Sequence, residues 1–182
     1  QFGIKTTEGL GMALIFTLYA IVMLSLYGGK LPTIFIKRMK TNPYEARMRA
    51  MLIFAFIPLV VLFAQPLGTY SPWFPVILIG IGCAAHQSWS ANIYTTVSDM
   101  FPKKAIATVT GIGGMAGGVS SMLMQASAGN LFVYADKVQL EFLGFVGKPA
   151  GYFIIFCICS VAYLVGWIIM KTLVPKYKII AG

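Results

Sequence analysis

Residues 50–98 read AMLIFAFIPLVVLFAQPLGTYSPWFPVILIGIGCAAHQSWSANIYTTVS, and they contain no Asp, Glu, Lys or Arg. A helix needs about 20 apolar residues to cross the hydrocarbon core of a bilayer, so an uncharged stretch of this length can cross it twice. Proline, glycine and serine gather at 66–72, where they favour a turn. The sequence therefore predicts two membrane-spanning helices, over about 50–67 and 73–97.

Composition extends this prediction to the whole chain. Of the 182 residues, 58% are hydrophobic and only 10% are charged, and the mean hydropathy of +0.81 lies outside the range of ordinary soluble proteins. Three further uncharged stretches predict spans over about 9–29, 105–134 and 149–170. The predicted fold class is all-α: a polytopic membrane bundle of five transmembrane helices.

Basic residues alternate between the connecting segments in step with the predicted spans. Only Lys5, Lys137 and Lys148 belong to one side of the membrane. The other side has eleven: Lys30, Lys37, Arg38, Lys40, Arg47, Arg49, Lys103, Lys104, Lys171, Lys176 and Lys178. Because cytoplasmic loops are enriched in Lys and Arg, we expect the amino end outside and the carboxyl end in the cytoplasm.

An external amino end has a further implication. The chain begins with Gln1 and shows no cleavable signal sequence before its first span. We therefore interpret residues 1–182 as the carboxyl-terminal transmembrane bundle of a longer protein whose preceding part holds an odd number of spans.

Several functional classes lack support. The three cysteines, Cys83, Cys157 and Cys159, lie in predicted spans and are expected to behave as small apolar groups. With a single histidine in the chain, no metal-ligand spacing is present, and neither a cofactor nor a catalytic residue is expected. The net charge of +9 follows the topology, so nucleic acid is not an expected partner.

A polar cluster, HQSWSAN at 86–92, lies within the third predicted span. Hydrogen-bonding side chains are costly inside a membrane and usually have a task there. At about 100° per residue, His86, Trp89, Asn92 and Thr96 share one helix face. An aromatic ring beside an imidazole, an amide and a hydroxyl suits a polyhydroxylated ligand. Structural hydrogen bonding is the alternative for this face, and it is the favoured interpretation for Gln87 and Ser90, because Gln87 points nearly the opposite way.

The predicted spans lack charge at their centres. All five acidic residues lie in loops or at span ends. If the protein couples transport to protons, the proton carrier is either His86 or a residue outside this chain. An anionic substrate would likewise need its countercharge from outside this chain.

The fourth predicted span is rich in small residues. Gly113 and Gly117, and likewise Gly114 and Gly118, are four residues apart, a spacing that lets membrane helices approach closely. The stripe is interpreted as a helix-packing face, and a moving or ligand-facing helix is the alternative.

Four stretches of the chain resemble the hexuronate transporters of the anion:cation symporter family, within the major facilitator superfamily. They are GGKLP (28–32), NPYEARM (42–48), AAHQSWSAN (84–92) and AIATVTGIGGMAGG (105–118). The resemblance covers nearly the whole chain. It implies that the five spans are helices eight to twelve of a twelve-helix transporter, with helix seven and the amino-terminal half preceding them.

The resemblance also implies a site. In similar organic-anion carriers, the tryptophan and neighbouring polar residues of helix ten contact substrate, a role that transfers to His86, Gln87, Ser88 and Trp89. Asn92 joins this set from its place on the helix face. The family's proton-coupling acids and substrate-binding arginine belong to the amino-terminal half.

The sequence thus predicts part of a secondary active transporter that carries a hexuronate or similar sugar acid by proton symport and alternating access. The expected location is a bacterial inner membrane, and no enzymatic activity is expected. The alternative is a membrane-embedded assembly subunit, in which the glycine-rich span packs on partner helices.

Overall fold

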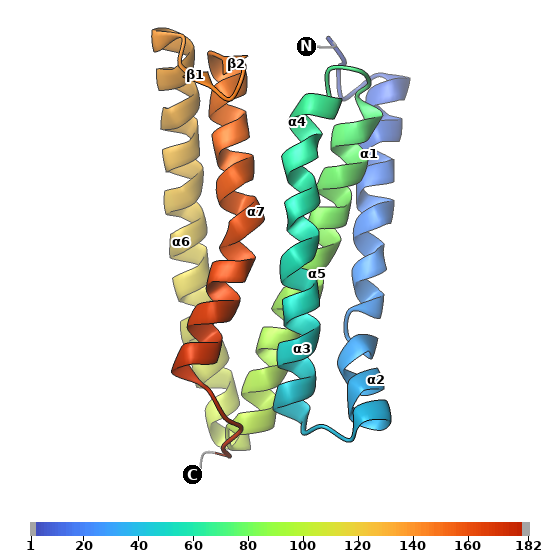
Figure 1. The fold of residues 1–182 in the computed structure, drawn as a ribbon, viewed down its shortest axis with the longest axis vertical. Coiled ribbons are helices and arrows are strands. Elements are labelled where there is room, and N and C mark those ends of the chain that lie inside the picture. The colour runs from blue at the N-terminus through green and yellow to red at the C-terminus, as the bar shows by residue number, and fades with distance from the viewer. Residues whose placement is uncertain (1–2, 180–182) are drawn as a thin grey trace.

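The chain is built almost entirely from long helices, and a computed structural model describes its residues 3–179. These helices run along one common axis (Figure 1). In chain order the elements are α1 (Gly9–Val22), the 3₁₀ helix η1 (Met23–Tyr27), α2 (Lys30–Met39), α3 (Pro43–Phe56), the 3₁₀ helix η2 (Ile57–Phe63), α4 (Ala64–Leu67), α5 (Trp73–Met100), α6 (Lys103–Val138), β1 (Glu141–Phe142), β2 (Phe145–Val146) and α7 (Lys148–Leu173).

The all-α prediction is confirmed. Among the described residues, four helical segments are long and apolar enough to cross a membrane: Gly9–Met39, Pro43–Leu67, Lys103–Val138 and Lys148–Leu173. Helix α5, the remaining predicted span, has 28 residues and so is about 42 Å long, which exceeds the roughly 30 Å hydrocarbon core. Its polar cluster lowers its hydropathy below that of the other four.

The segment between the first two predicted spans is helical, although the sequence favoured a loop there. Helix α2 fills residues 30–39, and α3 begins at Pro43. The Asn42 side chain accepts a hydrogen bond from the Glu45 backbone N–H at 2.8 Å, which caps α3. Proline suits the first turn of a helix. Helix α3 therefore begins before the uncharged stretch of residues 50–98, and its first turns carry the charged residues Glu45, Arg47 and Arg49.

Pro58 changes the backbone of the second predicted span. From Ile57 to Phe63 the α-helix gives way to a 3₁₀ helix, and α4 follows it. Proline has no N–H to donate and its ring clashes with the preceding turn, so a local change of helix type is its expected effect.

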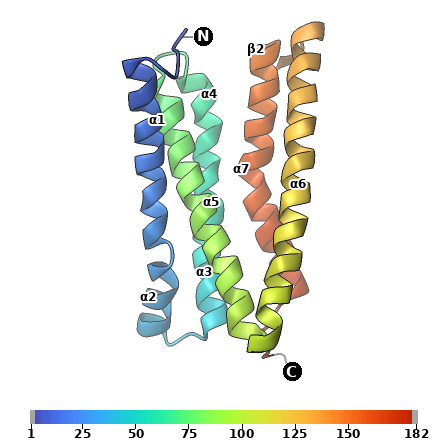
Figure 2. The same ribbon diagram turned by 180° about the vertical axis from the view of Figure 1, so that it is seen from behind.

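The helices form two groups. One contains α1, α2, α3, η2, α4 and α5, and the other is the pair α6 and α7 (Figures 1 and 2). The hairpin β1–β2 joins α6 to α7, with Glu141 opposite Val146 and Phe142 opposite Phe145. At the opposite end of the bundle, a short turn joins α5 to α6. Along its length, α7 also packs against α3 and η2.

The core lies where α3, α5 and α7 meet. Its buried members are Ala50, Met51, Phe54, Ala55 and Trp89. The indole Nε1 of Trp167 on α7 donates to the Met48 carbonyl of α3 at 2.8 Å, so α7 is held to the core by a polar contact as well as by packing.

The polar side chains of α5 are bonded mainly to their own helix. Five of them donate to the carbonyl four residues earlier, which satisfies these side chains within the helix itself. The donors are Ser88, Asn92, Thr95, Thr96 and Ser98, with distances from 2.5 to 3.4 Å.

Helix α6 has an open glycine face. A Cβ atom built at Gly111, Gly113, Gly114, Gly117 or Gly118 would meet no atom within 4 Å. Within the described part of the chain, no neighbour therefore packs against this stripe. The predicted helix-packing face has no partner among residues 3–179.

Gly28, after η1, lies in close contact with α5. A Cβ atom at this position would lie 2.2 Å from the Ser88 Oγ and 2.4 Å from its Cβ. Since Ser88 is buried on a helix, neither side could move away easily. The adjacent Gly29 has open space around it.

This difference defines a matched pair of substitutions. Gly28→Ala should lower the free energy of unfolding by about 1–3 kcal/mol, because the added methyl group overpacks the contact with Ser88. Gly29→Ala should leave stability nearly unchanged or raise it slightly. Thermal and denaturant unfolding of the purified protein in detergent micelles measures both, and equal stability of the two variants would contradict the close contact.

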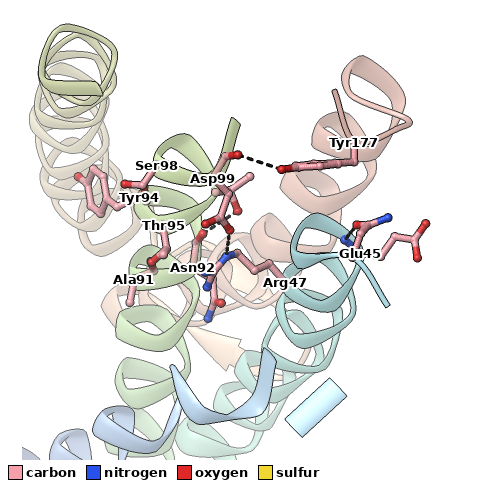
Figure 3. Close-up of polar contacts among 11 residues, drawn as sticks. Glu45, Arg47, Ala91, Asn92, Tyr94, Thr95, Ser98, Asp99 and Tyr177 are labelled. Atoms are coloured by element: carbon pink, nitrogen blue, oxygen red, sulfur yellow. Dashed lines mark hydrogen bonds and ion pairs between the residues drawn. The ribbon is translucent and has the colours of Figure 1, made fainter. Parts of the chain in front are cut away.

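The end of the bundle where α3 begins and α5 ends carries an ion pair (Figure 3). The Arg47 Nε lies 2.5 Å from the Asp99 Oδ2, and both side chains are largely buried. The Tyr177 hydroxyl, from the segment after α7, donates to the Asp99 carbonyl at 3.2 Å. We call this the basic end, because Lys103 and Lys104 also begin α6 there.

Removing the charge of Asp99 tests the pair. Asp99→Asn should lower stability by about 1.5–3 kcal/mol, since it weakens a charged hydrogen bond and leaves Arg47 without a countercharge. Glu45→Gln is the matched control, because Glu45 is exposed and forms no ion pair with any described residue. Denaturant titration of both variants at equal ionic strength compares them, and equal losses would show that the pair contributes nothing specific.

Candidate functional site

A cavity of about 330 Å³ lies between α5, α6 and α7, and we call it the central cleft. It contains the polar cluster's histidine and tryptophan together with residues of the other two helices. Its lining is His86, Trp89, Ser90, Ile93, Tyr94, Val97, Val109, Thr110, Gly113 and Tyr163.

His86 is exposed on α5 and contacts α7 across the cleft. Its Nδ1 lies 2.6 Å from the Tyr163 hydroxyl, and the two rings meet edge to face at 5.9 Å. A neutral imidazole has one nitrogen that donates and one that accepts. The Tyr163 hydroxyl can therefore fix which nitrogen of His86 remains available to a ligand.

Trp89 forms the boundary between the core and the cleft. Only 7% of its surface is exposed, and its ring lies 5.6 Å from that of Tyr163 at 72°. Trp89 belongs to the core cluster with Met51 and Phe54, and it also lines the cleft. Trp89 is consequently a rigid aromatic wall.

A second cavity of about 340 Å³ lies beside the first. Its lining is mostly apolar and includes Pro58, Cys83 and Phe156. The two cavities have only His86 and Tyr163 in common, so this hydrogen-bonded pair forms the wall between them.

Gln87 lies elsewhere. Its exposed side chain lines a groove of about 760 Å³ between α5 and α1, with Phe16 and Tyr19. It therefore does not share a cavity with His86 and Trp89, as its opposite position on the helix predicted.

Ser88 and Asn92 are buried away from the central cleft. The Ser88 hydroxyl donates to the Ala84 carbonyl at 2.9 Å, and the Asn92 amide donates to the Ser88 carbonyl at 2.8 Å. Asn92 is 1% exposed, and its Oδ1 accepts no hydrogen bond from any described residue. The predicted common face of His86, Trp89 and Asn92 is thus divided, because it covers a wide arc of the helix. His86 and Trp89 line the cleft, whereas Asn92, at the other edge of the arc, is buried in the bundle.

Tyr163 is the site residue that the sequence did not indicate. It lies on α7, 77 residues after His86, within a stretch of ordinary apolar and aromatic residues. Only the packing of α7 against α3 and η2 brings its side chain within reach of the polar cluster. A tyrosine in a predicted span would have been one weak signal, because its hydroxyl needs a partner when buried.

The central cleft is uncharged, and its mostly apolar lining carries a few polar side chains. No Asp, Glu, Lys or Arg lines it. The imidazole, the hydroxyls of Thr110 and Tyr94 and the indole of Trp89 provide hydrogen-bonding groups beside an aromatic surface. Within residues 3–179, no group of three His, Cys, Asp or Glu residues is placed to hold a metal ion.

A double-mutant cycle tests the wall between the cavities. His86→Ala and Tyr163→Phe should show a coupling energy of about 0.5–1.5 kcal/mol, because each removes the same hydrogen bond. The matched pair is His86→Ala with Tyr152→Phe. Tyr152 also lies on α7, but its ring packs on Phe132 of α6, so these two substitutions should be additive. Unfolding free energies in detergent measure both cycles, and additivity in both would contradict the contact.

Comparisons with known proteins identify no relative: no family model, no curated protein and no solved structure matches this chain. The likeness to hexuronate transporters therefore rests on the four sequence stretches themselves.

Proposed function

We propose that this chain is part of a membrane transporter that carries a hexuronate or a similar sugar acid, and that the central cleft is one wall of its substrate site. The observation that carries the proposal is the joint presence of His86, Trp89 and Tyr163 around one cavity in a bundle of membrane-length helices. Polar side chains inside such a bundle are costly and are typical of substrate pathways.

The proposed substrate class follows from the groups in the cleft. A pyranose ring has an apolar face that can pack on Trp89, and its hydroxyls can bond to His86 and Thr110. The cleft's volume of about 330 Å³ lies within the usual range for a small-ligand site. These features support a sugar-like ligand, and the four sequence stretches support a sugar acid.

Charge limits what this chain contributes. A sugar acid carries a carboxylate, and the cleft lining has no cation. The countercharge, and a carboxylate for proton coupling, would come from a part of the protein outside this sequence. His86 is the single histidine of the chain and lines the cleft, and it is the candidate proton carrier within the chain.

An assembly subunit without transport activity is the second candidate. The open glycine face of α6 favours it, because small residues at four-residue spacing let another membrane helix approach closely. Stable crosslinking of α6 to a heterologous protein, without substrate protection of Cys83 from thiol reagents, would support this function instead.

Uptake into proteoliposomes tests the transport proposal. In the reconstituted full-length protein, His86→Ala and Trp89→Ala should each reduce hexuronate uptake about tenfold or more, since each removes a contact to a polar ligand. Trp89→Phe should retain part of the activity, because it preserves aromatic packing on the core. Ser98→Ala is the control, since Ser98 is exposed on α5 and lines no cavity of the site.

Folding is checked separately by expression level and gel-filtration profile. Full uptake by both alanine variants, with normal folding, would reject the site. Loss of uptake in Ser98→Ala as well would show that α5 tolerates no change, and the site assignment would lose its support.

A further inference from the structure

An apolar cavity at the basic end is separate from the central cleft. It is a groove of about 530 Å³ between α5, α7 and the segment that follows α7, and we call it the tail groove. Its lining is Tyr44, Ile93, Thr96, Val97, Met100, Phe101, Met170, Leu173, Val174, Pro175, Lys176 and Lys178.

The two neutral polar side chains of the tail groove are already engaged. The Tyr44 hydroxyl donates to the Val174 carbonyl, and the Thr96 hydroxyl donates to the Asn92 carbonyl at 2.8 Å. Neither is free to donate to a polyhydroxylated ligand. The groove therefore offers an apolar surface and little else along most of its length.

Lys176 and Lys178 are the exception. Both are exposed, and neither forms an ion pair with any residue in the range 3–179. No acidic residue lines the groove. The Asp99 carboxylate nearby is engaged by Arg47. The two ammonium groups thus provide uncompensated positive charge at one end of an apolar surface.

The segment that carries these lysines is fixed in place by three contacts. Besides the Tyr44 contact to Val174, the Lys171 Nζ donates to the Pro175 carbonyl at 3.0 Å, and the Tyr177 hydroxyl donates to the Asp99 carbonyl (Figure 3). The groove wall formed by residues 174–178 is consequently a preformed part of the fold.

We propose that the tail groove binds an anionic phospholipid, with an acyl chain along the apolar lining and the phosphate at Lys176 and Lys178. The basic end is where such a headgroup would lie, because clustered lysines next to membrane helices attract anionic lipids. An amphiphile with one charged end matches a groove whose only free polar groups are two cations at one end. This inference is independent of the proposed transport function.

Lipid retention in native mass spectrometry provides the test. The purified protein in detergent is titrated with phosphatidylglycerol or with phosphatidylcholine of the same acyl chains. We expect tighter binding of phosphatidylglycerol, and the double variant Lys176→Gln/Lys178→Gln should weaken it about 10- to 30-fold. The matched control is Lys103→Gln/Lys104→Gln, which removes the same charge from the same end but leaves the groove lining intact.

Two further arms separate the possible ligands. Leu173→Trp, at an exposed position of the lining, should fill the groove and weaken phosphatidylglycerol binding without changing the charge. Inorganic phosphate at millimolar concentration should not displace the lipid if the acyl chain contributes. Equal weakening by the two lysine pairs, unchanged binding in Leu173→Trp or displacement by phosphate alone would each overturn the proposal.

Discussion

Helix α5 carries serine, threonine and asparagine side chains through the middle of an apolar bundle, and it satisfies most of them on its own backbone. The hydroxyls of Ser88, Thr95 and Thr96 each donate to the carbonyl one turn earlier. Buried polar groups without partners would destabilise the bundle. Because these bonds stay within the helix, neighbouring helices can pack on α5 through apolar contacts, and His86 and Trp89 remain available to the cleft.

The candidate functional surfaces lie where the pair α6 and α7 meets the other helices. The central cleft and its apolar neighbour lie where α7 passes α5, and the pair His86–Tyr163 stands between them. The tail groove lies farther along the same two helices and shares Ile93 and Val97 with the cleft. Both cavities are mainly apolar, but the polar groups of the cleft are neutral, whereas those of the tail groove include two lysines at the basic end.

Much of the fold could be predicted from the sequence because hydrophobic length and the absence of charge are local properties. They identified the helices, and the change of helix type at Pro58 is likewise a local effect of one residue. The helical start of α3 was missed because its cap, Asn42, precedes charged residues that looked like a loop. Tyr163 and the contact between Gly28 and Ser88 were missed because distant segments create them, and a single helix wheel cannot show which edge of a face meets the core.

The polar contacts that α5 makes with other segments are unevenly distributed along its length. Among the described residues they occur from Ser88 at η1 and from His86 at α7, and then at Asp99 with Arg47 and Tyr177. The first part of the helix, from Trp73 to Cys83, has no such bond to a neighbouring helix and depends on apolar packing alone. That packing is close: a Cβ atom at Gly80 would lie 3.1 Å from the Ile21 side chain of α1, and one at Gly82 would lie 2.8 Å from the Val61 side chain of η2, so shape complementarity rather than hydrogen bonding fixes this half of α5.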